Sequence, residues 1–227
     1  MARATLDVRK QKLKKEYDKQ ASLYDVCLEK HLSIKNRAPL SSEWVRGMEA
    51  EDKNFIRLAN PKSGEVALDM ACGTGRVFLK LVEKRCIVHG IDISEKMLSI
   101  LKRKIAERRI SNSGEIAIGS IEKTGYNARY FDLVTCMGAM DYYPLSFARK
   151  VLSEAKRVLK PEGRVVIDFP LLGGELFEEF KKGEEKDGIR VYAYPQEKIE
   201  KAIQKSGLKI KKIVRAGMEF QFLLKKR

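Results

Sequence analysis

Long apolar runs are absent from this 227-residue sequence. No run reaches the roughly 18 residues that a membrane-spanning helix needs, and the charged N-terminus lacks the continuous apolar segment that is typical of a secretory signal. The sequence has only two histidines, His31 and His89, which lie far apart in the chain. We therefore predict no metal site. The four cysteines include no C-x-x-C pair, which favours reduced thiols in a cytoplasmic protein over disulfides or zinc ligands.

Acidic residues are outnumbered: 46 Lys and Arg against 31 Asp and Glu give a net charge of +15. The basic residues concentrate in the first 20 positions, in the segment 102–109 and near the C-terminus. We interpret them first as solvated faces of a soluble protein. The alternative is that this surface attracts an anionic partner, such as an acidic membrane, a nucleic acid or a phosphorylated substrate.

The first 60 residues have the pattern of helices. One long amphipathic helix is indicated by a stripe of residues spaced alternately seven and four apart: Leu6, Leu13, Tyr17, Tyr24 and Leu28. Pro39 interrupts the stripe, and a second helix is predicted from Ser42 to about Asn60 and Pro61. We therefore expect residues 1–60 to form a helical lid on a main domain over residues 61–227.

From Glu65 onward, short apolar runs alternate with amphipathic ones. This alternation predicts an α/β fold, doubly wound, in which helices cover both faces of a mostly parallel seven-stranded sheet. A tight turn at Ala216 and Gly217 predicts a hairpin, and hence one antiparallel C-terminal strand. The polar stretch within 170–194 is expected to be an excursion between the fifth strand and the last helix. The predicted strands are 65–70, 86–92, 114–119, 131–137, 163–169 and the two arms of the hairpin, and the predicted helices lie near 75–84, 95–109, 146–159 and 195–206.

The turn after the first strand and the end of the second strand carry the chemistry. Asp69 is followed by the small residues Ala71, Gly73 and Gly75, which would let a ligand approach main-chain amides, and Arg76 would begin a helix. Asp92 ends the next strand, where a carboxylate can accept both ribose hydroxyls of a nucleoside. A nicotinamide or flavin dinucleotide site is the main rival. It needs a third small residue at position 78, which is Phe78, and a phosphate-binding G-K-[ST] loop is absent.

Four motifs in this order and spacing, LDMACGTGR, GIDIS, FDLVTCMGAMDYYP and LKPEGRVVID, resemble those of class I S-adenosylmethionine-dependent methyltransferases. The similarity spans about residues 61–224, and the opening YDKQASLYD resembles the lead-in helix of the small-molecule branch that contains the ubiquinone and menaquinone methyltransferases. The resemblance implies a Rossmann-like fold, S-adenosylmethionine as cofactor and S-adenosylhomocysteine as product.

The resemblance also implies roles for individual residues. Asp69 and the 71–75 turn would hold the amino-acid end of the cofactor, and Asp92 its ribose. Ser120 stands where many relatives have an acidic residue that contacts the adenine, and Glu122 could substitute for it. Four tyrosines are candidate aromatic faces for the sulfonium: Tyr17, Tyr24, Tyr142 and Tyr143. The complete predicted cofactor set is Tyr24, Asp69, Ala71, Cys72, Gly73, Thr74, Gly75, Asp92, Ile93, Met97, Ser120, Ile121, Cys136 and Met137.

The acceptor side is predicted after the fourth strand, at Asp141, Tyr142 and Tyr143, with Asp141 as the candidate base. The Asn/Asp-Pro-Pro-Tyr run of enzymes that methylate bases or glutamine amides is absent, so we expect a small-molecule or lipid-like acceptor, with the N-terminal helices as a lid and 170–194 as a second wall. A basic helix lying on an anionic membrane remains an alternative, and nucleic acid is a less favoured partner. Other functions left open are an RNA or protein methyltransferase, an NAD(P)-dependent oxidoreductase and a non-enzymatic binding protein of the same fold.

Overall fold

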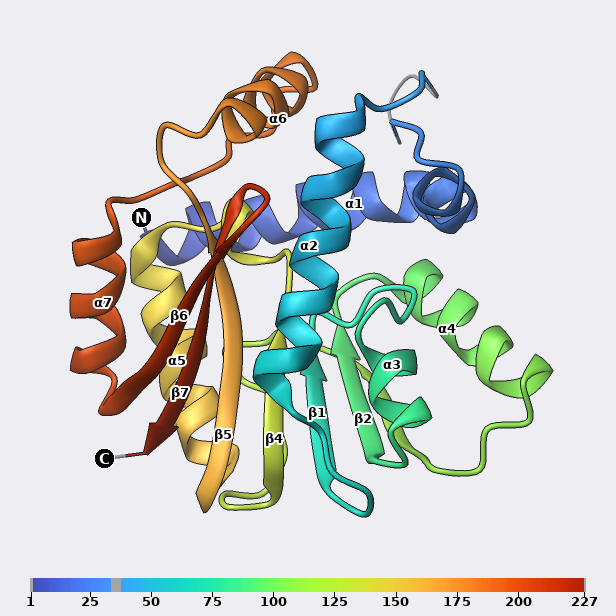
Figure 1. Cartoon of the computed structure of the whole chain (residues 1–227), viewed down its shortest axis with the longest axis vertical. Coiled ribbons are helices and arrows are strands. Elements are labelled where there is room, and N and C mark those ends of the chain that lie inside the picture. Colours follow the sequence, from blue (N-terminus) through green and yellow to red (C-terminus); the bar gives the residue numbers. More distant parts are fainter. Residues whose placement is uncertain (1, 34–37, 227) are drawn as a thin grey trace.

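The computed structural model describes residues 2–33 and 38–226, so the part of the predicted lid at 34–37 lies outside the described residues. A seven-stranded sheet has the order β3-β2-β1-β4-β5-β7-β6 (Figure 1). The first five strands run parallel, and β7 is antiparallel to both of its neighbours, which confirms the predicted fold class. The strands are β1 (Val66–Met70), β2 (Ile87–Asp92), β3 (Ser113–Ile118), β4 (Phe131–Cys136), β5 (Leu159–Pro170), β6 (Leu208–Ala216) and β7 (Glu219–Lys226).

Helices cover both faces of the sheet (Figure 1). On one face, α2 (Ser42–Ala59), α3 (Phe78–Glu83) and α4 (Glu95–Glu107) share an apolar core with the strands. On the other face, α5 (Leu145–Val158) and α7 (Gln196–Lys205) share a second core. The helices α1 (Ala2–Glu29) and α6 (Glu175–Lys186) lie beyond the upper ends of the strands in Figure 1, and the short 3₁₀ turn η1 (Met140–Tyr142) follows β4.

The two N-terminal helices have separate places. Although the sequence groups them as one lid, α2 packs on β5, β6 and β7, with Phe55 fully buried. Ser41 caps α2 by accepting a hydrogen bond from the Trp44 amide, and Asn60 ends it in a left-handed conformation. Of the two, α1 alone extends across the ends of the strands.

Two predicted boundaries were wrong, and one segment contains a helix that was not predicted. The helix after β1 begins at Phe78, not Arg76, because residues 71–77 form turns and the Asp69 carboxylate accepts the Phe78 amide hydrogen. The polar stretch after β5 forms α6, whose first turn is acidic and whose Phe177 is buried. The hairpin turn consists of residues 217 and 218, since Ala216 already pairs with Glu219.

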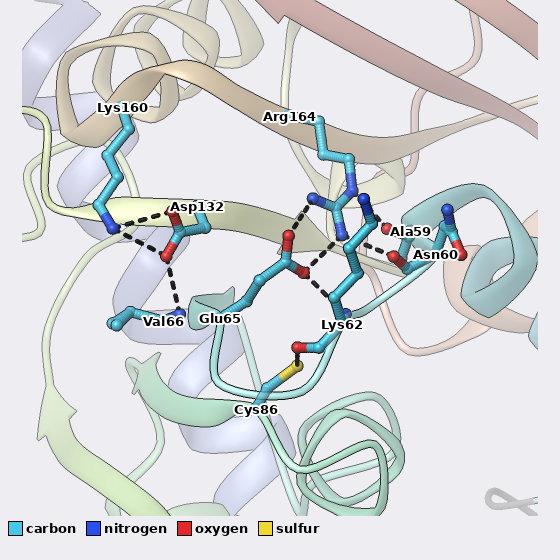
Figure 2. Close-up of polar contacts among 9 residues, drawn as sticks. All are labelled: Ala59, Asn60, Lys62, Glu65, Val66, Cys86, Asp132, Lys160 and Arg164. Atoms are coloured by element: carbon cyan, nitrogen blue, oxygen red, sulfur yellow. Dashed lines mark hydrogen bonds and ion pairs between the residues drawn. The ribbon is translucent and has the colours of Figure 1, made fainter.

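The amino-terminal end of the sheet is fastened by Arg164 of β5 (Figure 2). Its guanidinium donates to the Ala59 and Asn60 carbonyls at the end of α2, at 2.5 and 2.8 Å. It also forms a bidentate ion pair with Glu65, with N–O distances of 2.8 and 2.7 Å. Because two charge-assisted bonds and two carbonyl bonds meet on one side chain, α2 is tied to the start of β1 and to β5.

Among the described residues, no helix combines the length and the apolarity that crossing a bilayer requires.

Candidate functional site

A cavity lies at the carboxyl ends of β1, β2, β3 and β4, where the strand order reverses between β1 and β4. This is the place at which open α/β sheets bind ligands. Its walls come from α1 and from the ends of these strands with the segments that follow them. The lining residues are Leu13, Tyr17, Tyr24, Asp69, Ala71, Cys72, Gly73, Thr74, Arg76, Val77, Asp92, Ile93, Met97, Ser120, Ile121, Met137, Gly138, Ala139, Tyr142 and Tyr143.

The turn after β1 has a run of left-handed backbone conformations, with φ of +58° at Ala71, +50° at Gly73 and +98° at Gly75. A Cβ added at Gly73 would meet nothing within 4 Å, so this residue leaves open space at the cavity wall. A Cβ added at Gly75 would lie 2.6 Å from Leu101 Cδ1 and 3.3 Å from Leu79 Cγ. The two glycines therefore differ: Gly73 faces the cavity, whereas Gly75 lets the turn pack on the core.

Asp92 is held rigidly at the end of β2. One carboxylate oxygen accepts the Gly73 amide hydrogen at 2.9 Å, and the other accepts the Ser94 amide hydrogen at 2.8 Å. Burial raises the pKa of Asp92, and these amides oppose the shift by stabilising the charged form. Each oxygen has a second lone pair, so the carboxylate can still accept hydrogen bonds from a ligand.

Asp69 is buried at the end of β1, between β4 and α3. Its Oδ1 accepts a hydrogen bond from Thr135 Oγ1 at 2.8 Å, and the carboxylate also accepts the Phe78 amide hydrogen. Burial raises the pKa of Asp69 to about 7, and both hydrogen bonds counteract that rise. The carboxylate thus fixes the glycine turn while it contributes to the cavity wall.

Charged residues of α1 contact the segments that follow β1, β2 and β3. After β1, Thr74 Oγ1 donates to Asp25 Oδ1 at 2.7 Å, and Lys104 Nζ lies 2.7 Å from Asp25 Oδ2. After β2, Ser94 Oγ donates to Asp18 Oδ1 at 2.6 Å. These contacts hold α1 over the turns that carry Gly73 and Asp92.

The segment after β3 is held in the same way. Lys10 of α1 forms an ion pair with Glu122, which also accepts a hydrogen bond from Ser120 Oγ. Glu122 is therefore already engaged, and Ser120 is the residue of this pair that lines the cavity.

Tyrosines form the wall between α1 and η1. The rings of Tyr17 and Tyr142 meet edge to face with their centroids 5.8 Å apart, and those of Tyr17 and Tyr24 are 6.5 Å apart. Burial raises the pKa of Tyr17 and of Tyr142 well above the usual value, so both phenols stay neutral. Tyr143 stacks on Phe147 at 4.1 Å. These aromatic rings form the wall of the cavity after β4.

Most of the predicted cofactor residues line the cavity, but Gly75 and Cys136 do not. Cys136 is buried in β4. Of the predicted acceptor-side residues, Tyr142 and Tyr143 line the cavity and Asp141 does not. Sequence reasoning left Leu13, Tyr17, Arg76, Val77, Gly138 and Ala139 out of the predicted set. The helical stripe shared with Tyr24 could have identified Leu13 and Tyr17.

Sequence reasoning also missed a group of buried carboxyls behind η1. Asp141, Asp168 at the end of β5, Glu219 at the start of β7 and Glu51 of α2 all lie within electrostatic reach of one another. Burial raises the pKa of Asp168 and Glu219 well above the usual range, and that of Asp141 and Glu51 to about 7. Tertiary folding brings these carboxyls together from distant parts of the chain, so no local sequence pattern predicts the group.

The segment 170–194 was expected to form a second wall of the cavity, but none of its residues lines it. It supports the wall from outside instead. Phe180 of α6 packs against Tyr142 with ring centroids 6.1 Å apart, and the Gly188 and Arg190 carbonyls accept hydrogen bonds from Lys12 and Arg9 of α1.

Within residues 2–33 and 38–226, no three His, Cys, Asp or Glu side chains are grouped so that they could hold a metal ion.

Comparison with solved structures places the fold. Magnesium protoporphyrin IX methyltransferase from Synechocystis PCC 6803, with bound S-adenosylhomocysteine, superposes with a TM-score of 0.73 at 17% identity, over 96% of this chain and 100% of that one. A family model described as a methyltransferase domain matches residues 67–163, which contain the glycine turn, Asp92 and the segment after β4. Residues 67–163 thus form a methyltransferase domain, and the fold of the chain is that of the class I methyltransferases. The resemblance that the four motifs indicated is thereby confirmed.

Curated relatives of the chain carry methyltransferase names. Demethylmenaquinone methyltransferase of Thermotoga maritima is 37% identical over 117 residues, which are 51% of this chain and 48% of the relative. YqeM of Bacillus subtilis, which also carries a methyltransferase name, is 33% identical over 158 residues, which are 67% of this chain and 54% of that protein. The chain thus spans about half the length of these curated relatives.

Proposed function

We propose that this methyltransferase transfers a methyl group from S-adenosylmethionine to a small-molecule acceptor. The observation that carries the proposal is the cavity at the reversal of strand order, which combines the open Gly73 position, the buried Asp92 carboxylate and an aromatic wall after β4. A dinucleotide site is disfavoured because such a site needs a small residue at position 78, where the bulky Phe78 is completely buried in the core.

The lining residues fit this cofactor. Asp69 and the 71–74 turn would hold the amino-acid end, and Asp92 the ribose hydroxyls. Ile93, Met97, Ser120 and Ile121 follow β2 and β3 and would surround the adenine. When bound, S-adenosylmethionine supplies a methyl group that is already activated by positively charged sulfur.

The acceptor would lie between α1 and the segment after β4. Leu13, Tyr17, Ala139 and Tyr143 give this part of the cavity an apolar surface, which suits a small and largely apolar molecule. The methyl group is already activated by the cofactor, so the protein need not supply a nucleophile of its own. Its residues would act by positioning the acceptor and excluding water. Asp141 is buried in η1 and does not line the cavity, so it would position η1, and it could act as a proton acceptor only through another group.

We assign the role of lid to α1. It covers the cavity through Tyr17 and Tyr24 and is held by polar contacts of Lys10, Asp18 and Asp25. Such contacts can be broken and remade at small cost, whereas the apolar burial of α2 on the sheet cannot, so entry of ligands requires movement of α1 and not of α2.

Isothermal titration calorimetry tests the cofactor assignment. The protein should bind S-adenosylhomocysteine and S-adenosylmethionine, and Asp92→Ala should weaken both at least tenfold through loss of a buried acceptor pair. Glu107→Gln, at an exposed ion pair on α4, is the matched control and should leave both affinities unchanged. Preferential binding of NADH, or equal affinities in wild type and Asp92→Ala, would overturn the assignment.

Methyl transfer from radiolabelled cofactor into fractionated cell extract tests the acceptor class. We expect label in the small-molecule or lipid fraction. Label confined to RNA or protein would refute the small-molecule assignment while leaving the cofactor assignment intact.

The outer side of α1 supports a membrane-delivery role for the same helix. Lys14, Lys15 and Lys19 line a surface groove with Lys96 of α4, and Asp18 is the acidic residue in that groove. Charge of this density attracts anionic lipid. Flotation with vesicles that contain anionic lipid at low salt should retain the protein, and the triple variant Lys14→Gln/Lys15→Gln/Lys19→Gln should lose retention. A wild type that does not float with these vesicles would exclude this role.

A further inference from the structure

Arg76 introduces a positive charge into a cavity whose other charged lining groups are carboxylates. It directly follows the glycine turn after β1, and it is the basic residue among the described residues that line the cavity. The acidic lining residues are Asp69 and Asp92. A guanidinium at this place needs a physical reason, because burying it costs solvation free energy that a partner must offset.

The Arg76 side chain is fixed from the outside by α2. Its Nε forms an ion pair with Asp52, 2.7 Å from Oδ1, and its Nη2 lies 4.0 Å from Glu51 Oε2. Its side chain is 27% exposed. Because a guanidinium has five N–H donors in one plane, these two contacts orient the group without using all of its donors.

The neighbouring carboxyls do not neutralise this charge completely. Asp52 is shared, since Lys80 pairs with its other oxygen. The other carboxyls within electrostatic reach of Arg76 are Glu51, Asp168 and Glu219. They are buried, and burial favours their neutral form, which donates or accepts hydrogen bonds without adding negative charge. Asp52 is therefore shared between two cations, Arg76 and Lys80, and the Arg76 guanidinium lines the cavity, where it can pair with a further anion.

We propose that Arg76 is the receptor for a carboxylate group of a ligand bound in this cavity. The fixed, planar guanidinium matches the geometry of a carboxylate. The carboxylate has two chemical sources, the amino-acid end of the cofactor and an acidic group on the acceptor. The proposal deepens the assigned methyltransferase function and rests on it. Asp52 is the positioning residue, because it acts by holding the guanidinium in place.

Two nucleoside probes distinguish the first source. S-adenosylhomocysteine carries the amino acid, whereas 5′-methylthioadenosine has the same adenosine and thioether without it. If Arg76 binds the cofactor carboxylate, Arg76→Gln should weaken S-adenosylhomocysteine about 10- to 100-fold in calorimetry and leave 5′-methylthioadenosine within about twofold. Arg76→Lys keeps the charge but loses the planar fork, so it should fall between the wild type and Arg76→Gln.

A second pair of probes tests the acceptor source. With the protein saturated by S-adenosylhomocysteine, 4-hydroxybenzoate and phenol differ by one carboxylate. If the acceptor supplies the acid group, the wild type should prefer 4-hydroxybenzoate, Arg76→Gln should lose that preference, and S-adenosylhomocysteine affinity should be unchanged.

Two results would overturn the proposal. The first is that the wild type binds S-adenosylhomocysteine and that Arg76→Gln has the same affinity for it and the same preference for 4-hydroxybenzoate over phenol as the wild type. The other is equal weakening of S-adenosylhomocysteine and 5′-methylthioadenosine in both Arg76 variants, which would show a structural role. Failure of the wild type to bind any adenosyl ligand is a different outcome and refutes the proposed function itself.

Discussion

The two glycines of the turn after β1 give a quantitative prediction, because both have a positive φ and they differ in what surrounds them. Gly75→Ala forces a Cβ to within 2.6 Å of Leu101 Cδ1 at a φ of +98°. We expect about 1–2 kcal/mol of backbone strain and about 1–3 kcal/mol from overpacking against Leu101 and Leu79. The free energy of unfolding should therefore fall by about 2–5 kcal/mol.

Gly73→Ala is the matched variant. Its Cβ would enter open space at a φ of +50°, so the backbone strain alone applies and the loss of stability should be about 1–2 kcal/mol. The added methyl would project toward the cavity and should weaken S-adenosylhomocysteine binding at least tenfold. Urea unfolding and calorimetry on both variants measure the two effects. A Gly73→Ala variant that is less stable than Gly75→Ala, or one that binds the ligand like wild type, would refute the reasoning.

Three further predictions concern other parts of the molecule. Arg164→Met should lower the free energy of unfolding in urea by about 2–3 kcal/mol, because it leaves the largely buried Glu65 carboxylate and two carbonyls without their donor. The control Arg103→Met, at an exposed ion pair, should change the free energy of unfolding by less than about 0.5 kcal/mol. Burial raises the pKa of Asp141 from 3.8 to about 7, so its contribution to stability is full below pH 4 and is lost as the pH rises through 7. Urea unfolding at pH 5 and at pH 8 measures how much the free energy of unfolding falls between these two pH values. This fall should be about 2–3 kcal/mol smaller for Asp141→Asn than for wild type, and an equal fall would contradict the assignment. Asp25→Asn weakens the contacts to Thr74 and Lys104. Amide hydrogen exchange in α1 should therefore become about fivefold faster than in wild type, while exchange in α2 stays unchanged. Unchanged exchange in α1 would show that these contacts do not hold the helix in place.

Much of the sheet was predictable because its signals are local. Buried parallel strands are nearly continuous apolar runs, as in β1, whose residues Ala67–Met70 are all buried. The antiparallel strand was predictable from the turn at Gly217, although the turn lies one residue further along than expected. The helix α6 was missed because its apolar residues, Leu176, Phe177 and Phe180, all lie in its first half, and the polar run from Lys181 onward hides the short apolar stripe.

The candidate site was predictable to the extent that its residues follow strands. The carboxyl ends of neighbouring parallel strands lie at the same edge of the sheet. Residues at or just after these ends were therefore expected to lie close together, as Asp69, Asp92, Ser120 and Met137 do. The division of roles between Gly73 and Gly75 was not predictable, because both belong to one short turn and they differ through Leu101 on a separate helix.

The sequence by itself determined the α/β class, the family and the edge of the sheet at which a ligand binds, because strand period, turn chemistry and motif spacing are local properties of the chain. Only the tertiary structure decided that α1 and not α2 covers the cavity, that Asp141 faces buried carboxyls, and that Asp52 of α2 holds Arg76 at the cavity wall. These facts depend on which long-range partner a side chain meets after folding. Burial and charge pairing, which set the chemistry of the site, arise between residues that no local pattern connects.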